Sequence, residues 1–164
     1  MSKLIGKRLP RELMNKFRAQ SNIRSNEVPL LISTDPDGFP NVSLLSFLDI
    51  FMQAPDRLVF AIGEDSSSKK NLLRTGKGTI AVWGGKDSGM FYIKGRVRQL
   101  KEKLSLSVEG FRLTTLLMKV ERISQDHSDA AKLLTTLNYD NRAINKDHVL
   151  LFGELKKLAR SLAE

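Results

Sequence analysis

The sequence contains no cysteine and only two histidines, His127 and His148. Without cysteine the chain cannot form disulfides, use a thiol nucleophile or bind zinc or an iron–sulfur cluster through thiolates. Two histidines are too few for a histidine-rich metal site. The N-terminus lacks a signal-peptide apolar core, and no apolar run approaches membrane-spanning length. These absences predict a cytoplasmic protein with no metal site and no membrane partner.

The 164 residues are 41% hydrophobic and 27% charged, which is typical of one folded domain. No repeat, low-complexity tract or linker divides the chain. We therefore expect one domain over residues 1–164, with a basic N-terminal helix arm at 1–24, a barrel at 28–124 and C-terminal helices at 126–164.

The net charge of +9 is concentrated at the N-terminus. Before residue 25, seven basic residues face one acidic residue, Glu12. Such an arm could bind nucleic acid, a membrane surface or an acidic patch of another subunit. The alternative is that its charges lie on the solvated side of a helix. Nucleic-acid binding is disfavoured because the chain has no aromatic interleaving and no motif that reads DNA or RNA.

Six strands are predicted, at residues 28–34, 39–50, 58–62, 79–83, 90–100 and 111–123, separated by turn signals. In the second strand, Val42, Leu44 and Leu48 are expected to face the core, because side chains alternate along a strand. Asn41 and Ser43 would then lie on the opposite face.

The fifth predicted strand alternates between apolar and polar residues. Gly95 interrupts it, as a bulge or bend in a curved sheet would. Its apolar face holds Phe91, Ile93 and Val97, and its polar face holds Tyr92, Lys94, Arg96 and Arg98.

Helices are expected at 10–20, at 69–74, from Ser128 to Tyr139, and from Asp147 onward. In the last helix, leucines recur at steps of four, three and four residues, and their stripe could pack on its own domain or on another subunit. They are Leu151, Leu155, Leu158 and Leu162. The pattern predicts a mainly β fold with flanking helices, built around a small closed or partly open barrel of six strands.

The loop after the third predicted strand has the chemistry of an oxyanion site. Three hydroxyls precede two ammonium groups where a helix begins, and free backbone N–H groups there favour a phosphate. The residues are Ser66, Ser67, Ser68, Lys69 and Lys70. The alternative is a solvated loop with a serine N-cap and two exposed lysines, since neither Walker nor Rossmann spacing is present.

Four short motifs follow one another at 37–43 (DGFPNVS), 68–72 (SKKNL), 78–83 (GTIAVW) and 93–97 (IKGRV). Their order and spacing resemble the pyridoxamine 5′-phosphate oxidase-like superfamily of FMN-binding split β-barrels, over roughly residues 28–123. The resemblance implies a six-stranded split barrel of Greek-key type. It also implies a homodimer with FMN bound at the subunit interface.

The resemblance implies three groups of flavin contacts. Asn41, Val42 and Ser43 would line the ring, and Gly63 and Glu64 would lie beside the ribityl chain. The phosphate would be held by Ser68, Lys69 and Lys70, with Asn71 near it and with Ser66 and Ser67 in the same loop.

Three departures from the oxidase disfavour vitamin B6 oxidation. The second strand lacks the oxidase's basic residues, and Met90 replaces a glutamine that contacts the ring. No basic C-terminal residue matches those that grip the vitamin phosphate, since Arg142 and Arg160 lie in helical segments without the matching context.

The resulting expectation is an FMN-dependent oxidoreductase or reductase of unknown substrate, with NAD(P)H or another small molecule as its reaction partner. No residue is identified as a catalytic acid, base or nucleophile; structural roles are expected for Tyr92 and Lys94. The alternatives are a flavin carrier or sensor without turnover, a barrel without cofactor, and a deazaflavin in place of FMN.

Overall fold

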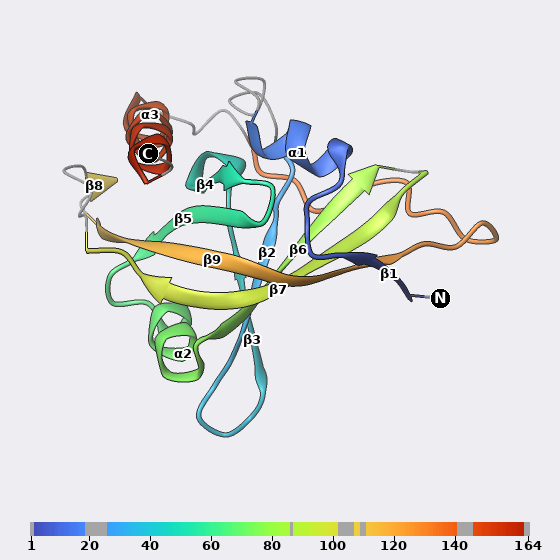
Figure 1. The fold of residues 1–164 in the computed structure, drawn as a ribbon, viewed down its shortest axis with the longest axis horizontal. Coiled ribbons are helices and arrows are strands. Elements are labelled where there is room, and N and C mark those ends of the chain that lie inside the picture. The colour runs from blue at the N-terminus through green and yellow to red at the C-terminus, as the bar shows by residue number, and fades with distance from the viewer. Residues whose placement is uncertain are drawn as a thin grey trace.

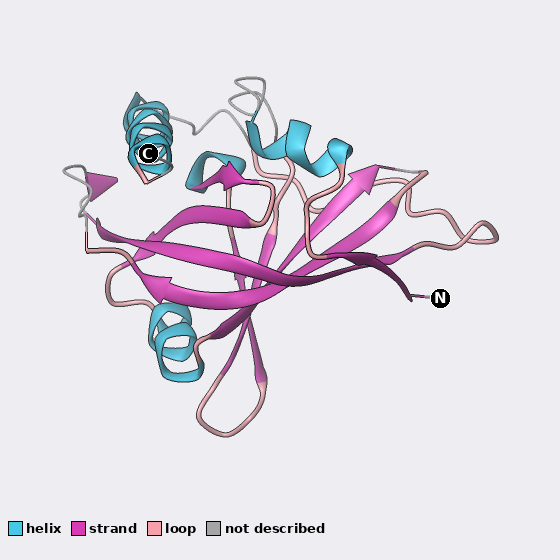
Figure 2. Ribbon diagram, in the orientation of Figure 1, coloured by secondary structure: helices cyan, strands magenta, loops and turns pink. Residues whose placement is uncertain are grey.

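The computed structural model describes residues 2–18, 26–85, 87–101, 107–108, 111–140 and 146–162. In these residues the chain forms a mainly β fold with flanking helices, as predicted (Figures 1 and 2). The elements are β1 (Ser2–Gly6), α1 (Arg11–Arg18), β2 (Leu30–Thr34), β3 (Pro40–Leu44), the 3₁₀ helix η2 (Phe47–Asp49), β4 (Ile50–Ala54), β5 (Arg57–Gly63), α2 (Ser67–Thr75), β6 (Lys77–Gly85), β7 (Gly89–Gln99), β8 (Ser107–Val108), β9 (Phe111–Asp126) and α3 (Lys146–Ser161).

The strands form one antiparallel path in the order β3-β2-β6-β7-β9-β5-β4. The 16-residue β9 is its centre, because β1 and β8 pair with β9 in addition to β5 and β7. Within the described residues the end strands β3 and β4 form no ladder with each other, so the curved sheet is open between them (Figure 1).

The predicted number of six strands is wrong, because the described residues contain nine. The predicted strand 39–50 is broken by Ser46, which caps η2 before β4 begins. The Ser46 side chain accepts from Leu48 N at 3.0 Å, and Asp49 Oδ2 accepts from Ser46 N at 2.8 Å. This reciprocal capping turns the chain by one 3₁₀ turn where the apolar pattern alone suggested a continuous strand.

The N-terminal arm is only partly helical. Residues Ser2–Gly6 pair with β9, from Ser2 opposite Asp126 to Gly6 opposite Ile123. The predicted helix follows as α1, which buries Leu13 and Phe17 in the core. The basic segment is therefore fixed to the sheet over its described length.

The helix predicted from Ser128 to Tyr139 is absent. Ser128 Oγ accepts from Ala131 N at 3.2 Å, as a cap would, but no helix continues from it. Backbone hydrogen bonds instead tie the segment to the start of the barrel, through Val28 N to Leu137 O and Tyr139 N to Asn26 O. Burial, and then the charge of Asp49, raises the pKa of the Tyr139 phenol above its ordinary value.

Apolar side chains lie on both faces of the sheet. The interior face, formed by β2, β4, β5, β6, β7 and β9, packs against α1 and includes Phe47, Phe60 and Phe91. The outer face of β4, β5 and β9 packs against α3 and includes Leu151 and Leu155. The leucine stripe thus packs on its own domain, which was one of the two predicted alternatives; the other was another subunit.

Gly95 bends β7 around β9, as predicted. The register shifts between Lys94 and Gly95, and a Cβ placed on Gly95 would lie 2.4 Å from Lys119 O. Only glycine permits that approach of two backbones. No helix in the described part of the chain combines the length and apolarity needed to cross a membrane.

The packing of α3 gives a first prediction. Leu155→Ala should lower the free energy of unfolding by about 2–5 kcal/mol, because Leu155 is fully buried and its loss leaves a cavity. Urea unfolding followed by circular dichroism measures this. The control is Leu150→Ala on the same helix, where the side chain is 54% exposed. Equal effects of the two variants would show that α3 is not packed on this sheet.

Candidate functional site

Helix α2 begins and ends where its sequence dictates. Ser66 Oγ accepts from Lys69 N at 3.2 Å and caps the first turn. Gly76, with φ of 64°, ends the helix by donating its N–H to Leu72 O at 2.8 Å. These two caps define the ends of the helix. Its N-terminal turn lies beside the β2–β3 hairpin.

Five polar side chains from three elements meet between α2 and the hairpin. Asn41 Nδ2 donates to Ser68 Oγ at 3.0 Å, and the hydroxyls of Ser43 and Ser68 form a short hydrogen bond. Asn71 Nδ2 donates to Ser33 Oγ at 3.4 Å. We call Ser33, Asn41, Ser43, Ser68 and Asn71 the serine–asparagine cluster.

The cluster is buried as well as connected. Ser33 and Ser68 are 3% exposed and Asn71 is 5% exposed. Buried polar groups without partners cost stability, so the mutual hydrogen bonds fix the position of α2 on the hairpin. The structure thus brings together four predicted site residues, Asn41, Ser43, Ser68 and Asn71.

Ser33 is a cluster member that the sequence analysis missed. It pairs with Asn41 in the β2–β3 ladder, so the two side chains share one face. The signal was available in residues 30–34 (LLIST), where Ser33 is a polar residue within an apolar strand. A hairpin register through the turn at 35–38 would have aligned it with Asn41.

The predicted orientation of β3 is wrong for two of its residues. Val42 and Leu44 are each 55% exposed, whereas Asn41 and Ser43 point toward α2. Because α2 covers the face that carries the polar residues, the apolar residues of this edge strand lie outside. Leu48, which belongs to η2, is buried as expected.

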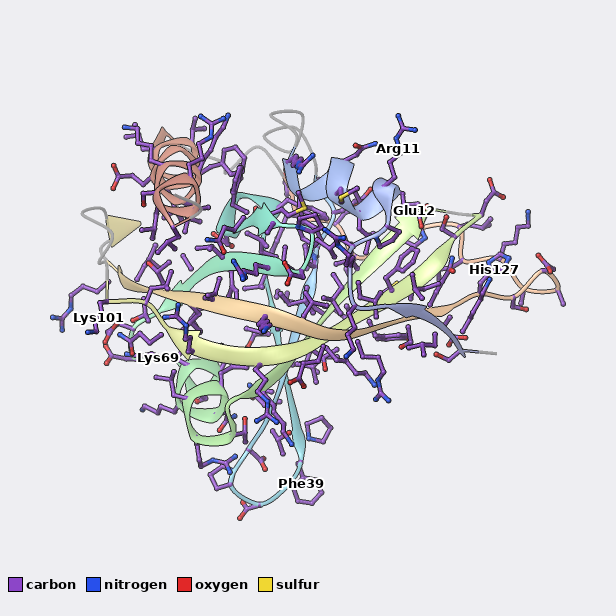
Figure 3. All side chains as sticks on the ribbon, in the orientation of Figure 1. Arg11, Glu12, Phe39, Lys69, Lys101 and His127 are labelled. Carbon is purple, nitrogen blue, oxygen red and sulfur yellow. The ribbon has the colours of Figure 1, made fainter. Side chains whose placement is uncertain are left out.

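Charged and hydroxyl groups surround the first turn of α2. Lys69 Nζ forms an ion pair with Glu64 Oε1, while Ser67 and Lys70 are exposed. The turn before the helix is held by Ser66 N donating to Gly63 O at 3.1 Å. Figure 3 shows Lys69 beside α2 at the sheet edge.

Met90 is not brought to this site within one chain. It lies opposite Trp83 in the β6–β7 ladder, about 20 Å along β7 from the part that contacts α2. There it lines a pocket of about 240 Å³ with Asp126 and His127. Figure 3 shows His127 and Lys69 well apart along the long axis of the molecule.

The groups at the first turn of α2 are suited to binding an oxyanion. The first N–H groups of α2 have no partner within the helix, and the helix dipole favours a negative charge there. Ser67 and Lys70 add an exposed hydroxyl and an exposed ammonium. No group of three or more metal-ligating side chains occurs among the described residues. His148 and Arg142 lie outside the residues whose side chains are described.

The comparisons with known proteins identify the fold. No protein-family model matches the sequence, and no curated protein matches it. Among solved structures, a candidate pyridoxamine 5′-phosphate oxidase from Lactobacillus delbrueckii is 16% identical, with a TM-score of 0.57 over 75% of this chain and 98% of that one.

Two further structures show the range of this fold. An FMN-binding protein from Syntrophomonas wolfei is 24% identical, with a TM-score of 0.50 over 72% of this chain and 88% of its own. A heme-binding protein from Mycobacterium smegmatis is 11% identical, with a TM-score of 0.51 over 77% of this chain and 58% of its own.

The chain is a split β-barrel with flanking helices. Its fold is that of the pyridoxamine 5′-phosphate oxidase-like proteins, so the resemblance of the four motifs is confirmed at the level of the fold.

The serine–asparagine cluster gives a second prediction. Ser68→Ala should lower the free energy of unfolding by about 1–3 kcal/mol, because Asn41 and Ser43 lose a buried partner. Chemical denaturation measures the change. Ser67→Ala is the matched control, since it makes the same replacement one residue earlier at an exposed position and should stay within about 0.5 kcal/mol. A silent Ser68→Ala would mean that the cluster does not position α2.

Proposed function

We propose that this protein binds FMN, with the phosphate at the N-terminal turn of α2. The observation that carries the proposal is the convergence of Asn41, Ser43, Ser68 and Asn71, which lie on separate elements and were expected at one flavin site. The S. wolfei protein with this fold is an FMN-binding protein, which supports the same ligand.

The residues present fit a phosphate monoester. Exposed Ser67 and Lys70 and the free N–H groups of α2 can hold its oxygens, while Lys69 is half of an ion pair with Glu64. The phosphate would have to share Lys69 with that carboxylate. Glu64 therefore weakens the site, and its removal should strengthen phosphate binding.

The flavin ring fits against β3. This strand pairs only with β2 among the described residues, so alternate backbone N–H and C=O groups are free along its outer edge. Exposed Val42 provides an apolar surface for a planar ring, and the short side chain of Ser43 allows close approach. Backbone groups of 41–43 can hydrogen-bond the polar edge of such a ring.

When bound, FMN supplies the redox chemistry of an oxidoreductase, and the chain binds and orients it. The second candidate is a flavin carrier or sensor without turnover. It is favoured by the composition of the serine–asparagine cluster, which contains hydroxyls and amides but no ionisable side chain.

A visible absorption spectrum of the purified protein separates the two candidates. Flavin absorbance that is bleached by NADPH or NADH under anaerobic conditions indicates a reductase. Flavin absorbance that neither nucleotide bleaches indicates a carrier or sensor. A colourless protein that takes up no FMN on titration contradicts both.

The phosphate assignment gives a third prediction. Replacing both Lys69 and Lys70 by alanine should weaken FMN binding at least about tenfold, or 1.4 kcal/mol. Glu64→Gln should act in the opposite direction, because it frees the Lys69 ammonium. Flavin fluorescence quenching at low ionic strength measures both. Unchanged affinity in the double variant would place the phosphate elsewhere.

We also propose a homodimer that forms each flavin site from two chains. The leucines of α3 are used within the chain, so the contact must lie elsewhere. The exposed apolar residues Val42 and Leu44 on β3 lie near Leu137, which is hydrogen-bonded to Val28 at the start of the same hairpin. A second copy would cover this surface and could bring its own Met90 toward the ring.

The dimer gives a fourth prediction. Light scattering at micromolar concentration with FMN should give twice the chain mass of 18.5 kDa. Leu44→Asp should shift the protein toward the monomer and weaken FMN binding, because it buries a charge in the contact. Leu4→Asp is the control at an exposed leucine of β1, 65% exposed against 55% for Leu44. A wild-type monomer that still binds flavin would refute the shared site.

A further inference from the structure

Four basic residues lie side by side across four adjacent strands. Lys77 of β6 is opposite Arg96 of β7, Arg96 is opposite Lys119 of β9, and Lys119 is opposite Arg57 of β5. We call these residues the cationic row. Adjacent strands are about 4.8 Å apart, so the row places four positive charges within about 15 Å.

The cationic row faces away from the barrel interior. The neighbours of its members along the strands, Leu58, Val97 and Met118, are all buried in the interior core. Because side chains alternate along each strand, the four basic side chains lie together on the outer face, and all four are exposed.

This arrangement costs some stability, which a bound anion would restore. Like charges directly opposite one another in a ladder are destabilising. One described ion pair reduces the charge, between Arg96 Nε and Glu121 Oε1 at 3.0 Å. Lys77, Lys119 and Arg57 make no ion pair with any residue of the described chain.

A groove of about 620 Å³ runs beside the row. Arg57, Arg96 and Lys119 line it, with Arg98 from the next outward position of β7. Leu117 and Leu162 of the outer face give it an apolar side, and the groove also reaches Gly76, Val97 and Gln53. Its volume is within the range of small-molecule sites.

Gln53 also lines the groove. Its side-chain oxygen Oε1 is buried beneath the surface and has no hydrogen-bond partner in the described structure, which costs stability. Cationic and apolar side chains thus lie in one groove.

We propose that this groove binds a small molecule that carries two or more phosphoryl groups, such as a nucleoside diphosphate or triphosphate. Arg57, Lys119 and Arg98 contact the phosphoryl oxygens. The organic part of the ligand lies against Leu117 and Leu162. A second copy of this chain does not fit here, because a two-fold contact would bring its own cationic row against this one.

The groove is separate from the proposed flavin site. It touches Gly76, at the C-terminal end of α2, whereas the phosphate of FMN would lie at the N-terminal end of that helix. Loss of one site should therefore leave the other intact. Parallel titrations with FMN distinguish the two.

Isothermal titration with inorganic tripolyphosphate and with ATP, at low ionic strength, tests the proposal on the full chain. The Arg57→Gln/Lys119→Gln variant should bind both at least about tenfold more weakly, with the affinity of the wild type falling as salt rises. The control Lys3→Gln/Lys7→Gln removes two exposed charges at the other end of the sheet and should change the affinity less than twofold.

A melting curve gives an independent reading. Without ligand, Arg57→Gln/Lys119→Gln should melt at a higher temperature than the wild type at low salt, because repulsion within the cationic row is reduced. The stabilisation of the wild type by tripolyphosphate should disappear in this variant. FMN affinity should be unchanged in it.

Three results would overturn the proposal. The first is a wild type that binds neither tripolyphosphate nor ATP. The second is an equal loss of binding in the control variant, which would indicate general charge attraction. The third is an oligonucleotide that binds the wild type more tightly than ATP does and no longer binds the same variant. That result would make the groove a nucleic-acid surface.

Discussion

The close contact between Gly95 of β7 and the backbone of β9 shapes the rest of the fold. A long strand such as β9 can pair on both sides only if its neighbours bend with it, and the bulge at Gly95 provides that bend. The register beyond the bulge sets Arg96 against Lys119. The same contact therefore curves the barrel and aligns the cationic row.

On the β2–β3 hairpin, polar side chains are buried under α2, whereas the apolar side chains of β3 are exposed. The face covered by α2 is joined by hydroxyls and amides, while Val42 and Leu44 are exposed. A buried polar contact is more directional than an apolar one, since each group needs a partner at a defined distance. The first turn of α2 is thereby held in one place relative to β3, which suits a ligand that would touch both.

Much of this arrangement could be predicted from local sequence signals. The turn at 35–38, a serine N-cap before the helix and the bulge at Gly95 each act through neighbouring residues, and each agrees with the structure. The same signals predicted that Ser68 lies where a helix begins. Their success reflects the short range of capping and turn interactions.

The predictions that failed depended on distant partners. The face of β3 is set by α2, and in the segment 128–140 the backbone groups of Leu137 and Tyr139 pair with residues 26–28 instead of forming helical bonds. The cationic row is invisible in the sequence, since its members become neighbours only through three ladder registers. Arg96 and Arg98 were recognised as one polar face, but not their alignment with Lys119 and Arg57.

The pairing of β1 with β9 has a consequence for how the chain folds. Ser2 lies opposite Asp126, so the first strand cannot find its place until nearly all of the barrel sequence has been made. Contacts of such long range slow folding, because the intervening chain must be ordered first. On the ribosome, the basic segment that contains β1 would emerge well before β9, and its positive charge would keep it hydrated until β9 is made.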